Sequence, residues 1–497
     1  MKIPRSSGIL LHPTSLPGAY GVGCLGLESR KFLDKLEQAG QRWWQILPLN
    51  PPGHGGSPYS AISAFAGNPV MVDLEDLGAW ITPEELEDFR RLCAALPADR
   101  FAIDTVTAAK TVLLNSVHLR WKAADHGTRE AHASFCKGEA GWLDDYSLFV
   151  AIKAEQDGLP WYEWPAEYVQ RDAATLEAAR TRLGGVIEQI KFAQWLFFDQ
   201  WTKLRAEAAE RGVKFIGDVP IFVSMDSVDA WANRHLFELD ANGQAQAVAG
   251  VPPDYFSETG QRWGNPLYNW AALSEQGYAW WIARVQKVLD TVDLVRIDHF
   301  RGFAAYWRVP AEEATAMNGT WVEGPRDAFF EAIRSALGEV PFIAEDLGLI
   351  TDDVFELRDR QGLPGMKVVH FAFDGTPDHP FLPHTYPENS VAYSGTHDND
   401  TTQGWYDKLD ELERHAVRSY FRQSDDTIVI GIIDSLLASR ASLVVFPAQD
   451  LFELGSGARM NTPGLSEGNW DWRMTADMLG CKEVWRRLGE LTRQHGR

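Results

Sequence analysis

The chain has 497 residues, of which 45% are hydrophobic and 23% charged, a balance typical of a globular protein with a large core. Its 69 acidic side chains outnumber the 47 Lys and Arg, and a net charge of -22 disfavours binding to nucleic-acid phosphates or anionic lipid surfaces. We therefore expect a small or neutral ligand, and neither nucleic acid nor membrane as a partner.

The N-terminal end of the chain predicts a cytoplasmic protein. The apolar run there covers residues 8–11, which is shorter than the core of a signal peptide. No stretch of the sequence approaches the roughly 20 apolar residues that a membrane-spanning helix needs. The four cysteines form no CxxC pair and have no histidines at zinc-binding spacing, so we expect reduced thiols and no metal site.

Short apolar or β-branched runs that end abruptly in polar residues predict eight β-strands. They span residues 8–14, 42–49, 214–221, 293–300, 341–346, 366–373, 390–398 and 442–450.

Helical patterns separate many of these runs, as at residues 279–289 and 325–337. Strands that alternate with helices favour parallel βα units, and eight such units predict a closed (β/α)8 TIM barrel. An open doubly wound sheet is the alternative, but the sequence has no Gly-rich phosphate loop to support it. We interpret residues 1–497 as one catalytic barrel with insertions.

The first long gap between strands, from about residue 67 to 211, is helical in pattern. Thr82 reads as an N-cap, Pro83 as the first helical residue and Glu85 as the partner that closes a capping box. The strong helix at residues 186–210 leads into the third strand and belongs to the barrel. The insertion itself is therefore predicted at about residues 67–185.

The second gap, about residues 222–278, carries turn residues and aromatic side chains. We expect it to form a smaller irregular lobe over the active site. The chain also has 20 tryptophans, and pairs such as Trp43-Trp44, Trp280-Trp281 and Trp470/Trp472 exceed what a core usually demands. Flat aromatic rings can stack on the apolar faces of sugars, although this indication is weak by itself.

Arg296 and Asp298 lie two residues apart on the fourth predicted strand, so both side chains point to the same side of the sheet. A neighbouring guanidinium lowers the pKa of an aspartate, which suits a nucleophile better than a proton donor. A structural ion pair inside the barrel is the other interpretation.

Glu345 ends the fifth predicted strand after four apolar or small residues, and partial burial of this kind raises the pKa of a carboxyl group. That property suits a general acid. His397 and Asp398 end the seventh strand, where they could bind sugar hydroxyls. Glycoside chemistry needs two carboxyl groups in different environments, and the sequence supplies both.

The segments RIDHFRGF, AEDLG and GTHDND, in this order, resemble the active-site segments of the amylomaltase family of 4-α-glucanotransferases, relatives of the α-amylases. The resemblance extends over nearly the whole chain, through RSSGILLHPTSLPG, GSPYSAISAFAGNP, GDVPIFV, GVPPDYFSETGQRWGNPLY and MNTPGLSEGNWDWR. The segment GDVPIFV lacks the histidine partner found in most α-amylases, which favours a transferase.

The resemblance implies a role for each matching residue. Asp298 resembles the nucleophile, Glu345 the general acid/base and Asp398 the carboxylate that stabilises the transition state. The remaining residues resemble substrate-binding or orienting positions, and they are Arg296, His397, Asp218, Tyr59, Trp263 and Asn469.

The implied reaction transfers part of an α-1,4-glucan to the 4-hydroxyl of glucose or another maltooligosaccharide, with retention of configuration and no cofactor. Retention predicts that the carboxyl groups of Asp298 and Glu345 stand about 5–5.5 Å apart with substrate bound. An α-glucan hydrolase and a non-catalytic glucan-binding protein are the alternatives. The products formed from maltotriose distinguish all three.

Overall fold

Eight parallel strands close into a barrel in the computed structural model, which describes residues 3–123, 126–253, 257–465 and 467–497. The strand order around the barrel is β1-β12-β11-β10-β9-β6-β3-β2. The strands are β1 (Ser6–Leu10), β2 (Trp43–Gln45), β3 (Lys214–Pro220), β6 (Leu294–Asp298), β9 (Phe342–Ala344), β10 (Gly365–Val368), β11 (Ser390–Tyr393) and β12 (Leu443–Pro447).

Each of the eight predicted runs overlaps one barrel strand, although β1 and β10 begin before the predicted run, so the predicted (β/α)8 fold is confirmed. Strands such as β1 and β12 are buried along their whole length, as expected when side chains fill the interior and helices cover the outside. Most strands end before the predicted run does. The polar residues at the ends of the runs have left the sheet and form the loops above the barrel.

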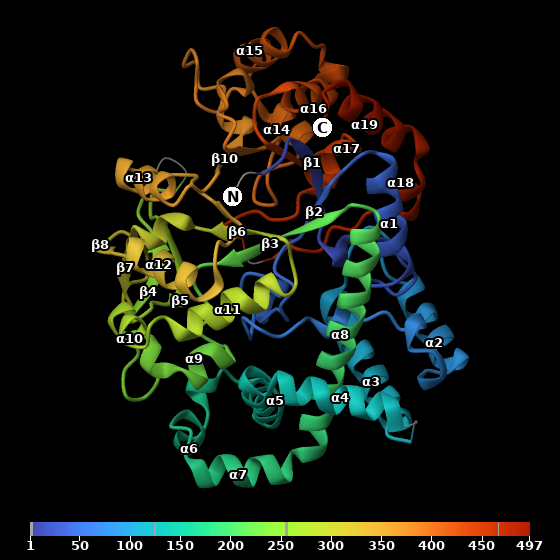
Figure 1. The fold of residues 1–497 in the computed structure, drawn as a ribbon, viewed down its shortest axis with the longest axis vertical. Coiled ribbons are helices and arrows are strands. Elements are labelled where there is room, and N and C mark those ends of the chain that lie inside the picture. The colour runs from blue at the N-terminus through green and yellow to red at the C-terminus, as the bar shows by residue number, and fades with distance from the viewer. Residues whose placement is uncertain (1–2, 124–125, 254–256, 466) are drawn as a thin grey trace.

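Helices surround this barrel and return the chain from one strand to the next (Figure 1). In the barrel proper they are α1 (Leu27–Gln38), α8 (Gly184–Glu210), α11 (Ala279–Leu289), α12 (Arg326–Leu337), α13 (Asp352–Arg360), α14 (Thr402–Lys408), α15 (Glu411–Phe421), α16 (Ile428–Ala438), α17 (Ala448–Leu451), α18 (Ala476–Gly480) and α19 (Lys482–Gln494). The last helix packs against α1 and α16, which brings the C-terminal end of the chain beside the first βα unit.

Between β2 and α8 the chain forms a group of helices below the barrel in the view of Figure 1. They are α2 (Pro83–Ala94), α3 (Ile103–Trp121), α4 (His126–Gly138), α5 (Ala140–Glu155), α6 (Ala166–Val169) and α7 (Ala173–Arg182). The predicted capping box of α2 is present, because Thr82 Oγ1 accepts from the Glu85 N–H and Glu85 Oε2 accepts from the Thr82 N–H. Helix α8 runs from this group up to the barrel.

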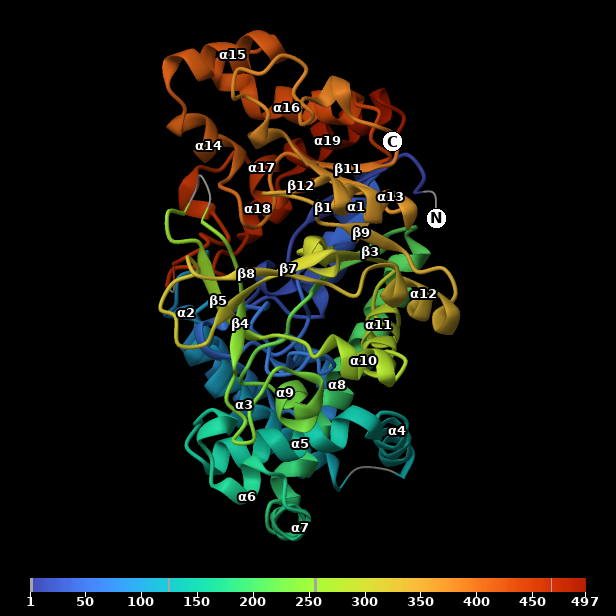
Figure 2. The same cartoon turned by 90° about the vertical axis from the view of Figure 1, so that its left-hand side faces the viewer.

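A second, antiparallel sheet lies beside the barrel (Figure 2), with the order β5-β4-β7-β8. Its strands are β4 (Ala247–Val251), β5 (Gln261–Pro266), β7 (Ala305–Pro310) and β8 (Thr320–Glu323), accompanied by α9 (Val228–Ala232) and α10 (Trp270–Glu275).

The segment 222–278 is thus more regular than its sequence indicated. Its strand β4 pairs with β5 of the same segment and also with β7, which follows β6, so part of the hydrogen bonding that orders it comes from a distant part of the chain. Residues 254–256 of this segment lie outside the described structure. Among the residues described, no helix combines the length and apolar character that crossing a bilayer requires.

Candidate active site

The acidic residues singled out in the sequence gather at the carboxyl ends of barrel strands. Asp218 lies near the end of β3, Asp298 is the last residue of β6 and Glu345 follows β9 directly. Asp398 lies in the loop after β11. Reactive groups of TIM-barrel enzymes are held at this face, because loops from several strands converge there.

Arg296 joins two of these acids. Its Nη1 donates to Asp218 at 2.7 Å, and its Nη2 lies 2.9 Å from Asp298 Oδ1. The register of β3 and β6 sets Asp218 opposite Arg296, while the strand alternation puts Arg296 and Asp298 on one face. The Asp218 and Arg296 side chains are buried, whereas the Asp298 side chain is 27% exposed. The guanidinium therefore orients the carboxylate that a substrate can reach.

Burial raises the pKa of Asp218 to about 6, in spite of the opposing effect of Arg296. This carboxylate remains ionised at neutral pH and is held by the hydroxyl of Tyr59, which donates to Asp218 Oδ2 at 2.9 Å. The Tyr59 ring also stacks on His397, with ring centroids 5.0 Å apart. Tyr59, in the loop after β2, thereby contacts both the end of β3 and the loop after β11.

Glu345 is in a different environment from Asp298. Burial raises the pKa of its carboxyl group to about 8, with Asp298 adding to the shift and Arg296 opposing it. Backbone N–H groups of His299 and Leu347 donate to its two oxygens at 2.7 and 3.0 Å. The carboxyl group is thus fixed in position and carries its proton at neutral pH, as a general acid requires.

The turn after β6 brings these two sites together. His299 follows Asp298 and has a left-handed backbone, with φ 53° and ψ 51°. A non-glycine residue adopts this conformation at a cost, and it is over-represented at functional sites. Here the turn directs the His299 N–H to Glu345, so the β6 end that carries one acid also holds the other.

Asp398 is held by three groups. His397 Nε2 lies 3.2 Å from Asp398 Oδ2, Asn461 Nδ2 donates to Oδ1 at 2.6 Å, and Arg459 donates to the backbone carbonyl of Asp398 at 2.6 Å. Burial would raise the pKa of Asp398, but His397 and Asn461 outweigh it and hold the pKa below the usual range. Asp398 is therefore an ionised acceptor, suited to sugar hydroxyls.

Asn461 and Arg459 were missed by the sequence reasoning. The contact between Asn461 and Asp398 spans 63 residues, and no local pattern announces it. The signal available was the segment MNTPGLSEGNWDWR, from which Asn469 was selected instead. Asn469 closes the loop that contains it, since its Oδ1 accepts from the Thr462 N–H at 2.8 Å and its Nδ2 donates to the Leu465 carbonyl at 2.8 Å.

Trp263 brings the antiparallel sheet to the site. Its ring meets the His299 ring edge to face at 4.8 Å, and the residue is 37% exposed. Trp263 and Asn469 thus lie in the loops and strands around the site, but neither has a described hydrogen bond to the three acids. Ser466, in the same segment as Asn469, lies outside the described residues.

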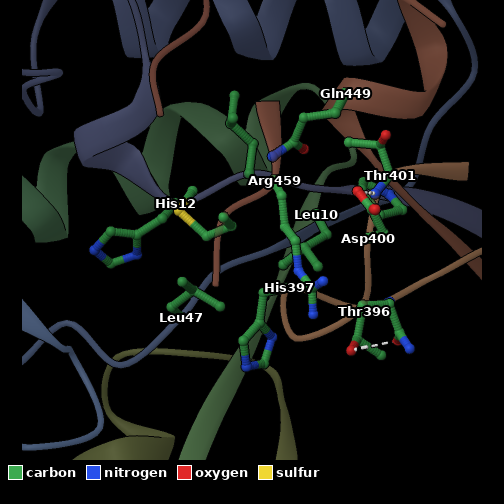
Figure 3. A pocket seen from close by; sticks show the side chains of 13 residues that line it. Leu10, His12, Leu47, Thr396, His397, Asp400, Thr401, Gln449 and Arg459 are labelled. Carbon is green, nitrogen blue, oxygen red and sulfur yellow. Dashed lines mark hydrogen bonds between the residues drawn. The ribbon is translucent and has the colours of Figure 1, made fainter. Parts of the chain in front are cut away.

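A pocket opens beside His397 (Figure 3). The ends of β1 and β12 and the loops after them line it, and among its lining residues are His12, Gln449 and Arg459. The Nδ1 atoms of His12 and His397 are buried and have no hydrogen-bond partner within the described residues. No group of three or more His, Cys, Asp or Glu side chains in the described ranges is arranged to hold a metal ion.

Comparisons with known proteins identify the family of this chain. A family model described as 4-alpha-glucanotransferase matches residues 11–478. The 4-alpha-glucanotransferase of Thermus thermophilus is 48% identical, over 100% of this chain and 97% of that protein, and that of Aquifex aeolicus is 43% identical, over 97% and 98%. The amylomaltase of Streptococcus agalactiae, solved in complex with acarbose, superposes with a TM-score of 0.96 at 35% identity and covers 99% of both chains.

Proposed function

The chain belongs to the 4-alpha-glucanotransferase family, and on that premise we propose that Asp298, Glu345 and Asp398 carry out the transfer by a retaining double displacement. The enzyme is a glycosyltransferase that acts on α-1,4-glucans. The observation that carries the mechanism is the contrast between its two principal acids. Glu345 keeps its proton at neutral pH because it is buried, whereas Arg296 contacts the more exposed carboxylate of Asp298.

In the first step Asp298 attacks C1 of a glucose unit while Glu345 protonates the departing oxygen, which leaves a β-linked glycosyl-enzyme. The part of the glucan beyond the cleaved bond leaves, and the oxygen protonated by Glu345 becomes its terminal 4-hydroxyl group. In the second step Glu345, now a carboxylate, removes the proton from the 4-hydroxyl of an incoming sugar. That oxygen attacks C1 and restores the α-linkage, so two inversions give retention.

The neighbouring residues orient these groups. Arg296 Nη2 contacts Asp298 Oδ1 and so orients the carboxylate for attack. Asp398, with His397 and Asn461 as its supports, binds hydroxyls of the sugar at the point of cleavage and stabilises the developing positive charge. The aromatic ring of Tyr59 lies at the same position, and its hydroxyl group donates a hydrogen bond to Asp218.

Transfer exceeds hydrolysis only if an acceptor sugar reaches the intermediate more readily than water does. Trp263, on β5 of the antiparallel sheet, lies against the loop that carries His299 and is partly exposed. We assign to it the stacking of an acceptor glucan beside the site. Glucose and maltooligosaccharides are the proposed acceptors, and the cytoplasm is the proposed location.

Incubation of the purified protein with maltotriose alone tests this function. A transferase produces glucose together with maltodextrins longer than the substrate, in a ladder that chromatography resolves. A hydrolase would give products shorter than maltotriose and no longer ones. Binding without any new product would indicate a glucan-binding protein and would contradict the proposal.

A further inference from the structure

A cysteine and a lysine touch inside the protein, away from the candidate active site. Lys110 Nζ, on α3, donates to the sulfur of Cys24 at 3.2 Å and to the carbonyl of Val70 at 2.6 Å. Lys110 is 1% exposed and Cys24 is 6% exposed. The Cys24 thiol in turn lies 3.6 Å from the carbonyl of Val22, which can accept its proton. The sulfur therefore presents a lone pair to the ammonium group.

The surroundings of this pair are unusual for a buried cation. No described carboxylate forms a direct ion pair with Lys110, although the buried Asp73 carboxylate acts on both Lys110 and Cys24 at longer range. The direct partners of the ammonium are one carbonyl and one sulfur. A second buried cation, Arg473, donates to the carbonyls of Leu16 and Gly18 in the same loop. Buried cations normally contact an acid directly, whereas the side chain in direct contact with Lys110 is a thiol.

The backbone holds Cys24 in place against Lys110. The N–H groups on either side of it, from Gly23 and Leu25, donate to the carbonyls of Thr14 and Met71 at 2.9 and 2.8 Å. A Cβ atom on Gly26 would lie 2.0 Å from Asp73 Oδ2, so this loop is closely packed against the segment that carries Met71. Sulfur and nitrogen are therefore preorganised at a separation that one oxygen atom can bridge.

We propose that Cys24 and Lys110 form a modification site, at which oxidation links Sγ to Nζ through a single oxygen atom. The oxidant is a peroxide. One molecule of hydrogen peroxide converts the thiol to a sulfenic acid and releases water. After Lys110 gives up its ammonium proton to solvent, a second molecule of peroxide oxidises the amine nitrogen as it bonds to the sulfenic oxygen, and two further waters leave. The two peroxides together accept four electrons.

The bridge ties the loop after β1 of the barrel to α3 of the helical insertion. The linked residues are 86 positions apart in the chain, so the bridge removes considerable freedom from the unfolded state. Burial raises the pKa of the Cys24 thiol, and the reaction is accordingly slow and needs sustained exposure to peroxide. A thiol reductant in excess supplies four electrons, cleaves both the S–O and the N–O bond, and restores the thiol and the amine with release of one water.

Peptide mapping of the full-length protein after exposure to hydrogen peroxide tests the proposal. Trypsin does not cleave after a modified lysine, so the expected product is peptide 6–30 joined to peptide 101–120, with one oxygen gained and two hydrogens lost. A reductant added before digestion should abolish it. The folded protein should melt roughly 4 °C higher when bridged than when reduced.

Two variants serve as controls, and neither residue belongs to the candidate active site. Cys93 is buried near the same cations, and Cys93→Ser should retain the linked peptide. Cys24→Val should lose both the linked peptide and the rise in melting temperature, with unchanged transferase activity. A disulfide between peptides 6–30 and 92–100 in place of the bridge would overturn the proposal. So would Cys24 oxidised to sulfinic acid with Lys110 still cleavable.

Discussion

The backbone N–H of His299 donates to Glu345 Oε2 at 2.7 Å. His299 follows Asp298 and binds Glu345, so any shift at the end of β6 moves both carboxyl groups. This hydrogen bond uses the backbone N–H, so it depends on the left-handed backbone conformation of His299 and not on the His299 side chain. The roles of the two acids, their pH dependence and their supports can each be tested.

Glu345→Gln should retain the nucleophile but lose the proton donor. With α-maltosyl fluoride, whose leaving group needs no protonation, Asp298 should still be glycosylated, while the second step lacks its base. The intermediate should accumulate as added glycan mass on the peptide that contains Asp298. Asp298→Asn is the matched control and should give no adduct. A glycan on the Glu345 peptide would reverse the two roles.

The pH dependence of kcat/KM should show a loss of activity above about pH 8. Burial raises the pKa of Glu345 to about 8, so the general acid is protonated below this pH and ionised above it. Asp398 remains ionised throughout the neutral range, because His397 and Asn461 hold its pKa down. An initial-rate profile from pH 5 to 10 checks this. A flat profile through pH 9 would show that Glu345 is not the acid.

The raised pKa of Glu345 also predicts how the stability of the protein changes with pH. The pKa of Glu345 is about 8 in the folded protein and 4.5 ordinarily, so between these values the unfolded chain releases a proton that the folded one keeps. Stability from this group is therefore lost as the pH rises from about 4.5 to 8. Glu345→Gln should show a smaller fall in melting temperature between pH 5 and pH 8 than the parent. Equal falls would contradict the shift.

Arg296→Lys should lower kcat by at least about 100-fold. The ammonium of lysine is a single point charge and cannot contact Asp218 and Asp298 together as the guanidinium does. Asp218 is then left buried without a full partner, which costs about 3–5 kcal/mol when such a pair is broken completely. Initial rates and denaturant unfolding of the variant measure the two effects. Normal turnover in Arg296→Lys would remove Arg296 from the mechanism.

Asn461→Ala should lower kcat about 10-fold, because Asp398 Oδ1 loses a charge-assisted hydrogen bond. Asn461→Asp keeps the size of the side chain but places a second carboxylate against Asp398. It should be the poorer enzyme, and its activity should recover as the pH falls. If both variants turn over like the parent, Asn461 does not support Asp398.

The sequence predicted those parts of the site that depend on neighbours in the chain. Alternation put Arg296 beside Asp298, and the apolar run before Glu345 indicated the buried environment that raises its pKa. What it could not predict depends on contacts between distant segments. Asp218 faces Arg296 because β3 and β6 are in register, and Asn461 reaches Asp398 from a loop after the last barrel strand.

The same distinction holds for the fold. Each barrel strand is a local apolar run, but β4 lies between β5 and β7 in its sheet, and β7 is far along the chain. The pairs Trp43-Trp44 and Trp280-Trp281 were a poor guide, because Trp44 and Trp281 are fully buried and belong to the core. Trp263, which reaches the site, is isolated in the sequence, whereas Trp470, which lies beside Tyr59, belongs to the Trp470/Trp472 pair.

Helix α8 has a consequence for any attempt to build a minimal version of this enzyme. It packs on α3, α4, α5 and α7 of the insertion and also on α1 and β3 of the barrel. The N-terminal half of α8 contains the buried residues Phe192 and Leu196 and packs on the insertion helices. The C-terminal half, which packs on the barrel, is continuous with it. Excision of residues 67–185 would expose that apolar face to water and to other copies of the chain. The insertion is therefore not a detachable module, and shortening should begin at the α6–α7 end, farthest from the barrel in Figure 1.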